Sequence, residues 1–183
     1  NQTNGRYMYH SMDATIGQTT NSLWLYAGTG DYERIGNTSN GTDNLMIGIR
    51  DPHYPEYRDV AVPKKAADLT KCKNTTKDKT GNKCPTSTDT GWYIKLDKSQ
   101  KVTAEPTVSS GLVYFPIYQP TSSVNKCSLG DAFICGVDDE CGTNFSSNLK
   151  NLRKGDTCKY VGQGVLSKIC LLYTSDAADE RRR

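Results

Sequence analysis

The stretch from Gly91 to Asn144, GWYIKLDKSQKVTAEPTVSSGLVYFPIYQPTSSVNKCSLGDAFICGVDDECGTN, decides the fold expected for this chain. Its β-branched and aromatic residues gather in short runs separated by turn residues, which is the pattern of antiparallel strands. We predict one strand for each of four runs: Trp92–Leu96, Lys101–Val108, Leu112–Tyr118 and Ala132–Val137. Ser109-Ser110-Gly111 supplies a tight turn between the second and the third. Antiparallel strands of this number and length, joined by short connections, have the size of one propeller blade.

The remainder of the chain repeats the pattern of strands and turns, so the expected fold class is all-β with long polar loops. Leu23–Ala27 and Asn44–Asp51 are predicted to be strands, and Lys159–Ile169 a strand pair or a strand with a glycine bulge. Arg6–Met12 is expected to end a strand and Ala14–Asn21 to be a polar turn region. Ala66–Lys71 is expected to hold one helical turn, which would be the single helical feature.

Composition excludes several functional classes. The hydrophobic content of 35% lies below the ~45–50% usual for globular domains, which fits strands joined by polar surface loops. The net charge of +3 is small and the lysines are scattered, so we expect no nucleic-acid partner. No apolar run approaches the ~18–20 residues of a membrane span, and no signal peptide is visible, which leaves the export of a longer parent protein open.

The last residues, 170–183, do not continue the pattern of the domain before them. Cys170 to Glu180, CLLYTSDAADE, resembles the translation of a widely used transposon-type sequencing adapter. We therefore expect residues 1–169 to be a partial β-propeller domain and residues 170–183 to be a non-native artefactual tail. The chain is then expected to be a fragment of a longer protein.

The cysteines predict disulfide bonds. Of seven cysteines, six remain once Cys170 is set aside with the tail: Cys72, Cys84, Cys127, Cys135, Cys141 and Cys158. An even set in polar loops is typical of a disulfide framework in an oxidising compartment. A zinc site is the alternative, although the chain has no CxxC pair and its histidines lie far from the cysteines in sequence. Connectivity stays open, and proximity favours the pairs Cys72–Cys84, Cys127–Cys135 and Cys141–Cys158.

Four segments taken in order resemble a known family. LWLYAGTGDYERIG, NLMIGIRDP, GWYIKLDKSQKVTAEPTVSSGLVYFPIYQP and CSLGDAFICGVDDECGTN look like the C-terminal β-propeller of PilC/PilY-type type IV pilus proteins. The resemblance covers most of residues 20–169 and is most specific in GWYIKL, KVTAEPTV and VYFPIYQP. It implies a seven-bladed, modified propeller, of which this chain would hold roughly two to three blades. It also implies an exported factor at the pilus tip that promotes pilus assembly, adhesion and surface sensing.

Metal and cofactor sites are weakly indicated. Some members of the family bind calcium through an Asp-rich loop of the DxDxDxxxD kind, and this pattern is absent here, so calcium remains an option only in the full-length protein. No cofactor is evident. The remaining metal candidates are Asp138, Asp139 and Glu140, but adjacent carboxylates on a strand point to opposite faces. A solvated turn between Cys135 and Cys141 is the favoured interpretation.

The residues suggest binding and give no sign of catalysis. No nucleophile and base are spaced as a pair, His10 and His53 are expected in loops or at strand edges, and Glu105 is expected to make a structural hydrogen bond. A quinoprotein-like propeller enzyme is one alternative, because it would share this architecture. A secreted eukaryotic glycoprotein binding module is the other, because glycosylation acceptor patterns begin at Asn37, Asn40, Asn74 and Asn144.

The predicted function is therefore that of a non-enzymatic type IV pilus assembly and adhesion factor in the periplasm or at the cell surface. Long polar loops on a strand scaffold are the expected contact regions, namely Tyr32–Asp43, Asp51–Thr90 and Asn144–Asp156. The expected partners are pilin subunits or minor pilins, and host or abiotic surfaces.

Overall fold

The computed structural model describes residues 6–38, 43–51, 53–56, 70–72, 90–97, 99–121, 129–143 and 157–171. Its regular structure within these ranges consists of strands only, which confirms the all-β class. The strands are β1 (Asp13–Ile16), β2 (Leu23–Gly28), β3 (Leu45–Asp51), β4 (Thr70–Cys72), β5 (Gly91–Lys95), β6 (Lys101–Val102), β7 (Thr107–Ser109), β8 (Leu112–Gln119), β9 (Asp131–Asp138) and β10 (Cys158–Gln163). The described residues contain no helix that could cross a membrane.

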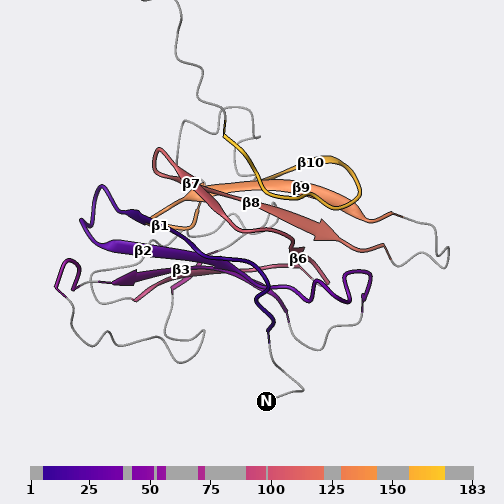
Figure 1. Ribbon diagram of the computed structural model, residues 1–183, viewed down its shortest axis with the longest axis horizontal. Helices are drawn as coiled ribbons and strands as arrows, with labels where there is room; N and C mark the ends of the chain where they lie inside the picture. Colours follow the sequence, from indigo (N-terminus) through magenta and orange to yellow (C-terminus); the bar gives the residue numbers. More distant parts are fainter. Residues whose placement is uncertain are drawn as a thin grey trace, which may run out of the picture.

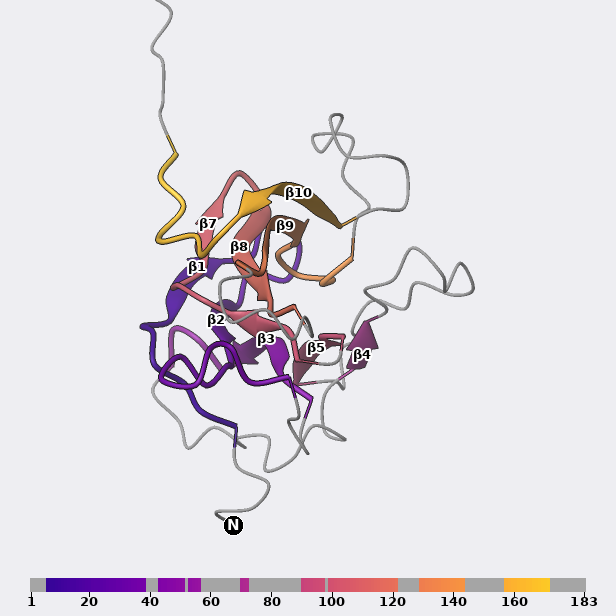
Figure 2. The same ribbon diagram turned by 90° about the vertical axis from the view of Figure 1, so that its right-hand side faces the viewer.

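The first sheet, here called sheet A, has the order β1-β2-β3-β5-β4. Its first four strands are antiparallel neighbours, with Tyr26 opposite Gly48 and Gly48 opposite Trp92. The short strand β4 then pairs in parallel with β5 at the edge of the sheet. In Figure 2, β4 lies outermost beside β5. A segment of the long insertion between β3 and β5 thus widens sheet A beyond a four-stranded meander.

The second sheet, sheet B, has the order β10-β9-β8-β6, and β7 also pairs with β8. β6 and β7 therefore occupy one strand position, which is interrupted at Glu105-Pro106. Proline cannot donate a backbone hydrogen bond to a ladder, so the break falls where the sequence demands it. The predicted strand Lys101–Val108 is thus two short strands. Figure 1 shows sheet B stacked on sheet A, in the two-layer arrangement of neighbouring blades.

The prediction that the strands of Gly91–Asn144 form one blade is wrong. Its first strand, β5, belongs to sheet A, and the fourth strand of sheet B is β10. The chain changes sheets between Leu96 and Lys101: the Leu96 amide donates to the Asn44 carbonyl beside β3 of sheet A, while β6 pairs with β8 of sheet B, with Val102 opposite Ile117. The alternation of residues predicted each strand, but it carries no information about which neighbour a strand will choose.

The amino-terminal prediction is also wrong. Arg6–Met12 forms no strand, and β1 begins at Asp13, inside the region expected to be a turn. The turn is shorter than predicted, because the Gly17 amide already donates to the Ser22 carbonyl. β1 reads as polar on its own and becomes a strand by pairing Ala14 with Leu25. The expected helical turn Ala66–Lys71 lies mostly outside the described residues, and its last two residues belong to β4.

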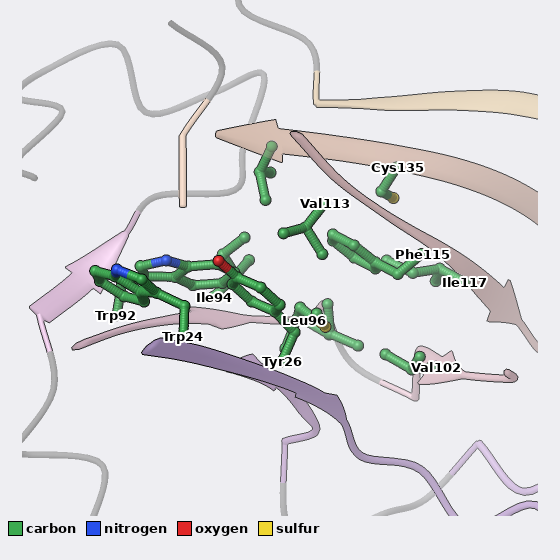
Figure 3. Packing of buried hydrophobic residues seen from close by; sticks show 12 residues of the cluster. Trp24, Tyr26, Trp92, Ile94, Leu96, Val102, Val113, Phe115, Ile117 and Cys135 are labelled. Atoms are coloured by element: carbon green, nitrogen blue, oxygen red, sulfur yellow. The ribbon is translucent and has the colours of Figure 1, made fainter. Parts of the chain in front are cut away.

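One core lies between the two sheets. Trp24, Tyr26 and Trp92 from sheet A are fully buried, and Figure 3 shows them side by side at one end of this core. The other members are Met46, Ile94, Leu96, Val102, Val113, Phe115, Ile117, Cys135 and Val137. Every second residue of β2 and β8 contributes, as expected for strands with one face against a core. Gly48 leaves room for Trp92, since a Cβ there would lie 2.5 Å from the indole Cε2.

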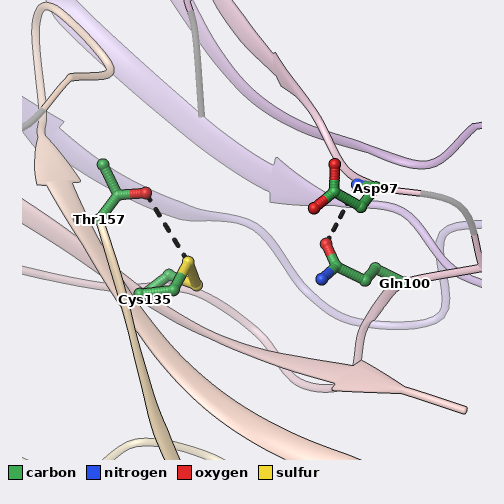
Figure 4. The surroundings of a disulfide bond; sticks show 5 residues. Asp97, Gln100, Cys135 and Thr157 are labelled. Atoms are coloured by element: carbon green, nitrogen blue, oxygen red, sulfur yellow. Dashed lines mark hydrogen bonds between the residues drawn. A yellow bond between two sulfur atoms is a disulfide. The ribbon is translucent and has the colours of Figure 1, made fainter. Parts of the chain in front are cut away.

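The disulfide framework is confirmed in one pair and wrong in its predicted connectivity. Cys135 is bonded to Cys158, which is its register partner on the neighbouring strand, with the Cα atoms 4.0 Å apart. Figure 4 shows this bond beside Thr157. The predicted pairs Cys127–Cys135 and Cys141–Cys158 are therefore excluded. Antiparallel pairing of β9 and β10 brings together cysteines that proximity in sequence keeps apart.

The other cysteines divide into three cases. Cys141 is also disulfide-bonded, to a cysteine whose side chain the structure does not describe. The predicted pair Cys72–Cys84 lies outside the described side chains. Cys170 is a free, exposed thiol. The register shift between Tyr160 and Gly162 confirms the predicted bulge in β10.

Candidate functional site

The predicted contact loops are partly visible. Of Tyr32–Asp43, residues 32–38 and 43 are described; Asp51–Thr90 is described only at its ends, at 53–56 and at 70–72; Asn144–Asp156 lies outside the described residues. The visible loop is anchored at both ends. Arg34 forms an ion pair with Asp31 at 2.7 Å, and Lys95 forms one with Asp43 at 2.5 Å.

A buried lysine also anchors the backbone of this loop. Lys101 is 1% exposed, and its ammonium donates to the carbonyl oxygens of Asn37 at 2.8 Å and Ser99 at 3.1 Å. Burial lowers the pKa of Lys101, and the charge of Asp31 acts in the opposite direction. The Ser99 hydroxyl also donates to the Thr38 carbonyl. The loop therefore presents its outer side chains on a supported backbone.

Three exposed tyrosines form a surface that the sequence prediction missed. Tyr7, Tyr9 and Tyr32 are between 42% and 45% exposed. The Gly30 amide donates to the Tyr7 carbonyl, which holds the amino-terminal segment against the end of β2. The rings of Tyr7 and Tyr9 lie 6.1 Å apart, and His10 meets Tyr32 edge to face at 5.4 Å. We call Tyr7, Tyr9 and Tyr32 the tyrosine surface. The alternation in RYMYH, which contains Tyr7 and Tyr9, predicts the end of a strand, but it marks side chains at the surface, and Tyr32 is the first residue of the predicted contact loop Tyr32–Asp43.

The metal candidates Asp138, Asp139 and Glu140 form a turn at the end of β9, here called the acidic turn. Asp138 Oδ1 accepts the amides of Glu140 at 3.1 Å and Cys141 at 2.8 Å. Asp139 is only 6% exposed, so the expected solvated turn is wrong. Among the described residues, no three His, Cys, Asp or Glu side chains converge in a way that would hold a metal ion.

The acidic turn instead reaches across to sheet A. Glu140 Oε1 accepts the Thr19 amide at 2.6 Å and Oε2 accepts the Thr20 amide at 2.8 Å, both in the turn between β1 and β2. The Trp92 indole donates to the Asp139 carbonyl at 2.8 Å within the core. Two consecutive residues after β9 of sheet B, Asp139 and Glu140, therefore bind two separate parts of sheet A.

Burial changes the ionisation of this region. Burial first, and then the charges of Asp138 and Glu140, raise the pKa of Asp139 to about 6. Burial also raises the pKa of Asp138, against the hydrogen bonds that its carboxylate accepts. Tyr26 has its pKa raised by burial and by these same carboxylates, and its hydroxyl has no hydrogen-bond partner among the described residues.

A small cavity of about 110 Å³ lies where β1, the break between β6 and β7, and the carboxyl-terminal segment meet. Glu105 faces it and forms an ion pair with Lys168, so the predicted structural role of Glu105 takes the form of a salt bridge. Asp13 also lines it, while its Oδ2 accepts the Val108 amide at 2.7 Å. Its carboxylates and lysine are thus engaged with one another or with the backbone. The remaining lining residues are Met12, Pro106 and Thr107.

The two histidines are in ordinary settings. His10 lies against Tyr32, and the exposed backbone of His53 donates to Asp51 Oδ1 at 2.9 Å. Neither side chain has a nucleophile or a carboxylate as a hydrogen-bond partner in the described part of the chain. The described residues therefore offer surfaces and anchored loops as their candidate functional features.

These features define a class of protein: an all-β, disulfide-containing scaffold of propeller-like sheets that carries long loops. No family model and no curated protein matches the chain. Among solved structures, the chain is similar to the C-terminal domain of PilY1 from Pseudomonas aeruginosa, with a TM-score of 0.58 and 12% sequence identity. The likeness covers 75% of this chain and 32% of that chain, so this chain spans about a third of the PilY1 domain. At this identity the likeness shows the fold alone.

Proposed function

We propose that this chain is part of a type IV pilus assembly and adhesion factor that works by binding and is not an enzyme. The observation that carries the proposal is the shared fold with the PilY1 C-terminal domain. The resemblance of GWYIKL, KVTAEPTV and VYFPIYQP to PilC/PilY-type sequences supports it from a different direction. A disulfide within the sheet suits the oxidising conditions of the periplasm or the cell surface.

The binding surface in this proposal combines the contact loops with the tyrosine surface. Exposed tyrosines offer large contact area and a hydroxyl at low conformational cost, and for this reason they are enriched where proteins meet partners. The Lys101 bonds to Asn37 and Ser99 keep the adjoining loop in place. A pre-organised surface loses less entropy on binding than a loose one. The partners would be pilin subunits or minor pilins, and host or abiotic surfaces.

The test uses the full-length parent protein in its own cells. Replacing Tyr7, Tyr9 and Tyr32 by serine is expected to reduce adhesion at an unchanged protein level, because the tyrosine surface is lost. The matched control is Tyr160→Ser, since Tyr160 is 51% exposed on β10 of sheet B and away from the loop. A second variant lacks residues 73–83 of the long insertion, which begin after β4 ends at Cys72. If both variants keep normal piliation and adhesion, the proposal is wrong for these regions.

The enzymatic alternative makes a separate prediction. A quinoprotein-like enzyme would bring a bound quinone through purification of the parent protein, together with dehydrogenase activity in a dye-reduction assay. The binding proposal expects neither. Detection of the chromophore at one equivalent per chain would favour the enzyme.

A further inference from the structure

The acidic turn makes contacts between the sheets that do not depend on apolar packing. Glu140 and Thr19 are 121 residues apart in sequence, yet both oxygens of the Glu140 carboxylate accept backbone amides there. Hydrogen bonds from amides to an ionised acceptor are roughly twice as strong as neutral ones. The receiving turn is itself fixed, because the Trp24 indole donates to Thr20 Oγ1 at 2.9 Å.

A second contact seats the turn on the core. The Trp92 indole donates to the Asp139 carbonyl, and Gly142 lies flat against the same ring. A Cβ at Gly142 would come within 2.5 Å of Trp92 Cδ2, and the residue has a φ of +69° that favours glycine. The Asp139 amide is held by the Gly111 carbonyl from the turn between β7 and β8. Any loosening of the turn would therefore change the packing and the hydrogen bond of the Trp92 indole.

The groups that surround Asp139 are acidic or uncharged. Asp138 and Glu140 flank it on its own turn. Sheet A contributes the Tyr26 hydroxyl, which lies within electrostatic range of all three carboxylates and of Asp13 in β1. The turn between β1 and β2 contributes amides, β5 an indole, and the turn between β7 and β8 a carbonyl group. In Figure 3 the Tyr26 hydroxyl points from β2 toward sheet B.

We propose that the acidic turn is an acid-responsive latch, which holds sheet B to sheet A more firmly in mildly acidic than in neutral surroundings. At neutral pH three adjacent carboxylates share a largely buried turn, and their mutual repulsion opposes the contacts of Glu140 and Trp92. Protonation of Asp139 removes one of these charges and leaves the Glu140 carboxylate in place as the acceptor.

The sign of the effect follows from linkage. The pKa of Asp139 in the folded protein is about 6, above the usual value for aspartate, so the folded state binds this proton more tightly than the unfolded state. The stabilisation that protonated Asp139 contributes is present at pH values near 4 and is lost as the pH rises through about 6. The latch goes beyond the proposed function, because it depends on no partner of the loops. For a protein outside the cell it would tie the rigidity of the scaffold to the pH of the medium.

The experiment compares the full chain with Asp139→Asn by chemical denaturation between pH 4.5 and pH 7.5. Tryptophan fluorescence is the readout, because Trp24 and Trp92 are the two tryptophans and both adjoin the latch. The unfolding equilibrium constant of the unmodified chain, divided by that of Asp139→Asn, is expected to fall on the order of tenfold from pH 7.5 to pH 4.5. The exposed Asp97 provides the matched control, Asp97→Asn, which keeps the pH dependence of the unmodified chain. A ratio that stays constant with pH overturns the proposal.

A direct titration keeps the proposal testable if Asp139→Asn fails to fold. In the full chain with ¹³C-labelled aspartate, the carboxyl signal of Asp139 is expected to titrate near pH 6. Glu140→Gln retains an oxygen acceptor but removes a neighbouring charge, so the midpoint of that signal should fall. If no aspartate titrates above pH 5 in the folded chain, the latch is not acid-responsive.

Discussion

Sheet A and sheet B close the same core with different chemistry. Sheet A supplies large aromatic side chains, and its two indole nitrogens donate hydrogen bonds at the end of the core, from Trp24 to Thr20 and from Trp92 to Asp139. Sheet B supplies mainly aliphatic residues and Phe115, and it is reinforced by the disulfide between Cys135 and Cys158. Two sheets with similar strand patterns are therefore stabilised by different interactions. Large rings, two of them hydrogen-bonded through their indole nitrogens, stabilise sheet A, and a disulfide bond stabilises sheet B.

The largest expected effect comes from removing the main ring of sheet A. Trp92→Ala is expected to lower the free energy of unfolding by about 3–5 kcal/mol, because it leaves a large cavity in the core. It also removes the donor to the Asp139 carbonyl. Trp92→Phe keeps most of the apolar volume and should cost about 1–2 kcal/mol, since a buried carbonyl is left unpaired. Urea denaturation followed by circular dichroism measures both. If Trp92→Phe is as stable as the unmodified chain, the hydrogen bond has no part in the difference between the sheets.

The next effect concerns the covalent link in sheet B. Replacing Cys135 and Cys158 together by alanine is expected to lower the free energy of unfolding by about 2–4 kcal/mol, mainly by releasing the constraint on the unfolded chain. Hydrogen exchange should accelerate first in β10, which forms an edge of sheet B, and later in β2. Cys170→Ser is the control, because this thiol is free and exposed. Equal acceleration in both sheets would show that the disulfide supports the whole core.

A smaller effect tests how closely the sheets approach each other. Gly28 of β2 faces Val102 of sheet B, and an added Cβ would lie 2.3 Å from Val102 Cγ1. Gly28→Ala is expected to cost about 1–3 kcal/mol through overpacking. The control is Gly36→Ala, since nothing lies within 4 Å of a Cβ at Gly36. Combining Gly28→Ala with Val102→Ala should recover part of the loss in a double-mutant cycle. Strict additivity would mean that these two residues do not limit the approach.

The smallest effect is expected at the surface. Lys168 pairs with Glu105, but the two side chains are 64% and 29% exposed. Lys168→Ala should therefore leave the free energy of unfolding nearly unchanged, because solvent screens an exposed ion pair. Thermal melts in low and high salt check this, with Lys159→Ala on exposed β10 as a control. A large loss would show that the segment after β10 contributes to the core contact.

Sequence reasoning found most of the strands and few of the contacts between them. Leu23–Ala27, Leu112–Tyr118 and Ala132–Val137 were predicted nearly to their bounds, because apolar and polar residues alternate there. β1 was not predicted, because Asp13–Ile16 is polar and short and becomes a strand only beside β2. Tyr7 and Tyr9 of the tyrosine surface were predicted to end a strand, since alternation looks the same whether the side chains face a core or the solvent.

In the candidate site, too, the sequence indicated the residues but not their contacts. The acidic residues at 138–140 stood out in the sequence as possible metal ligands, and their true surroundings could not be inferred from spacing. Burial of Asp139 depends on Trp92, and the role of Glu140 depends on a turn that lies 120 residues earlier. Partners at such separations are chosen by the packing of one sheet on the other.

Local sequence alone predicts that this chain forms strands, that its cysteines favour disulfides, and that its loops are long and polar. These properties are local: they follow from the alternation of side chains and from composition. The tertiary structure alone decided that Gly91–Lys95 completes sheet A, that Cys135 pairs with Cys158, and that the acidic turn binds the other sheet. Each of these depends on which surfaces meet, and that choice is made by the whole core at once.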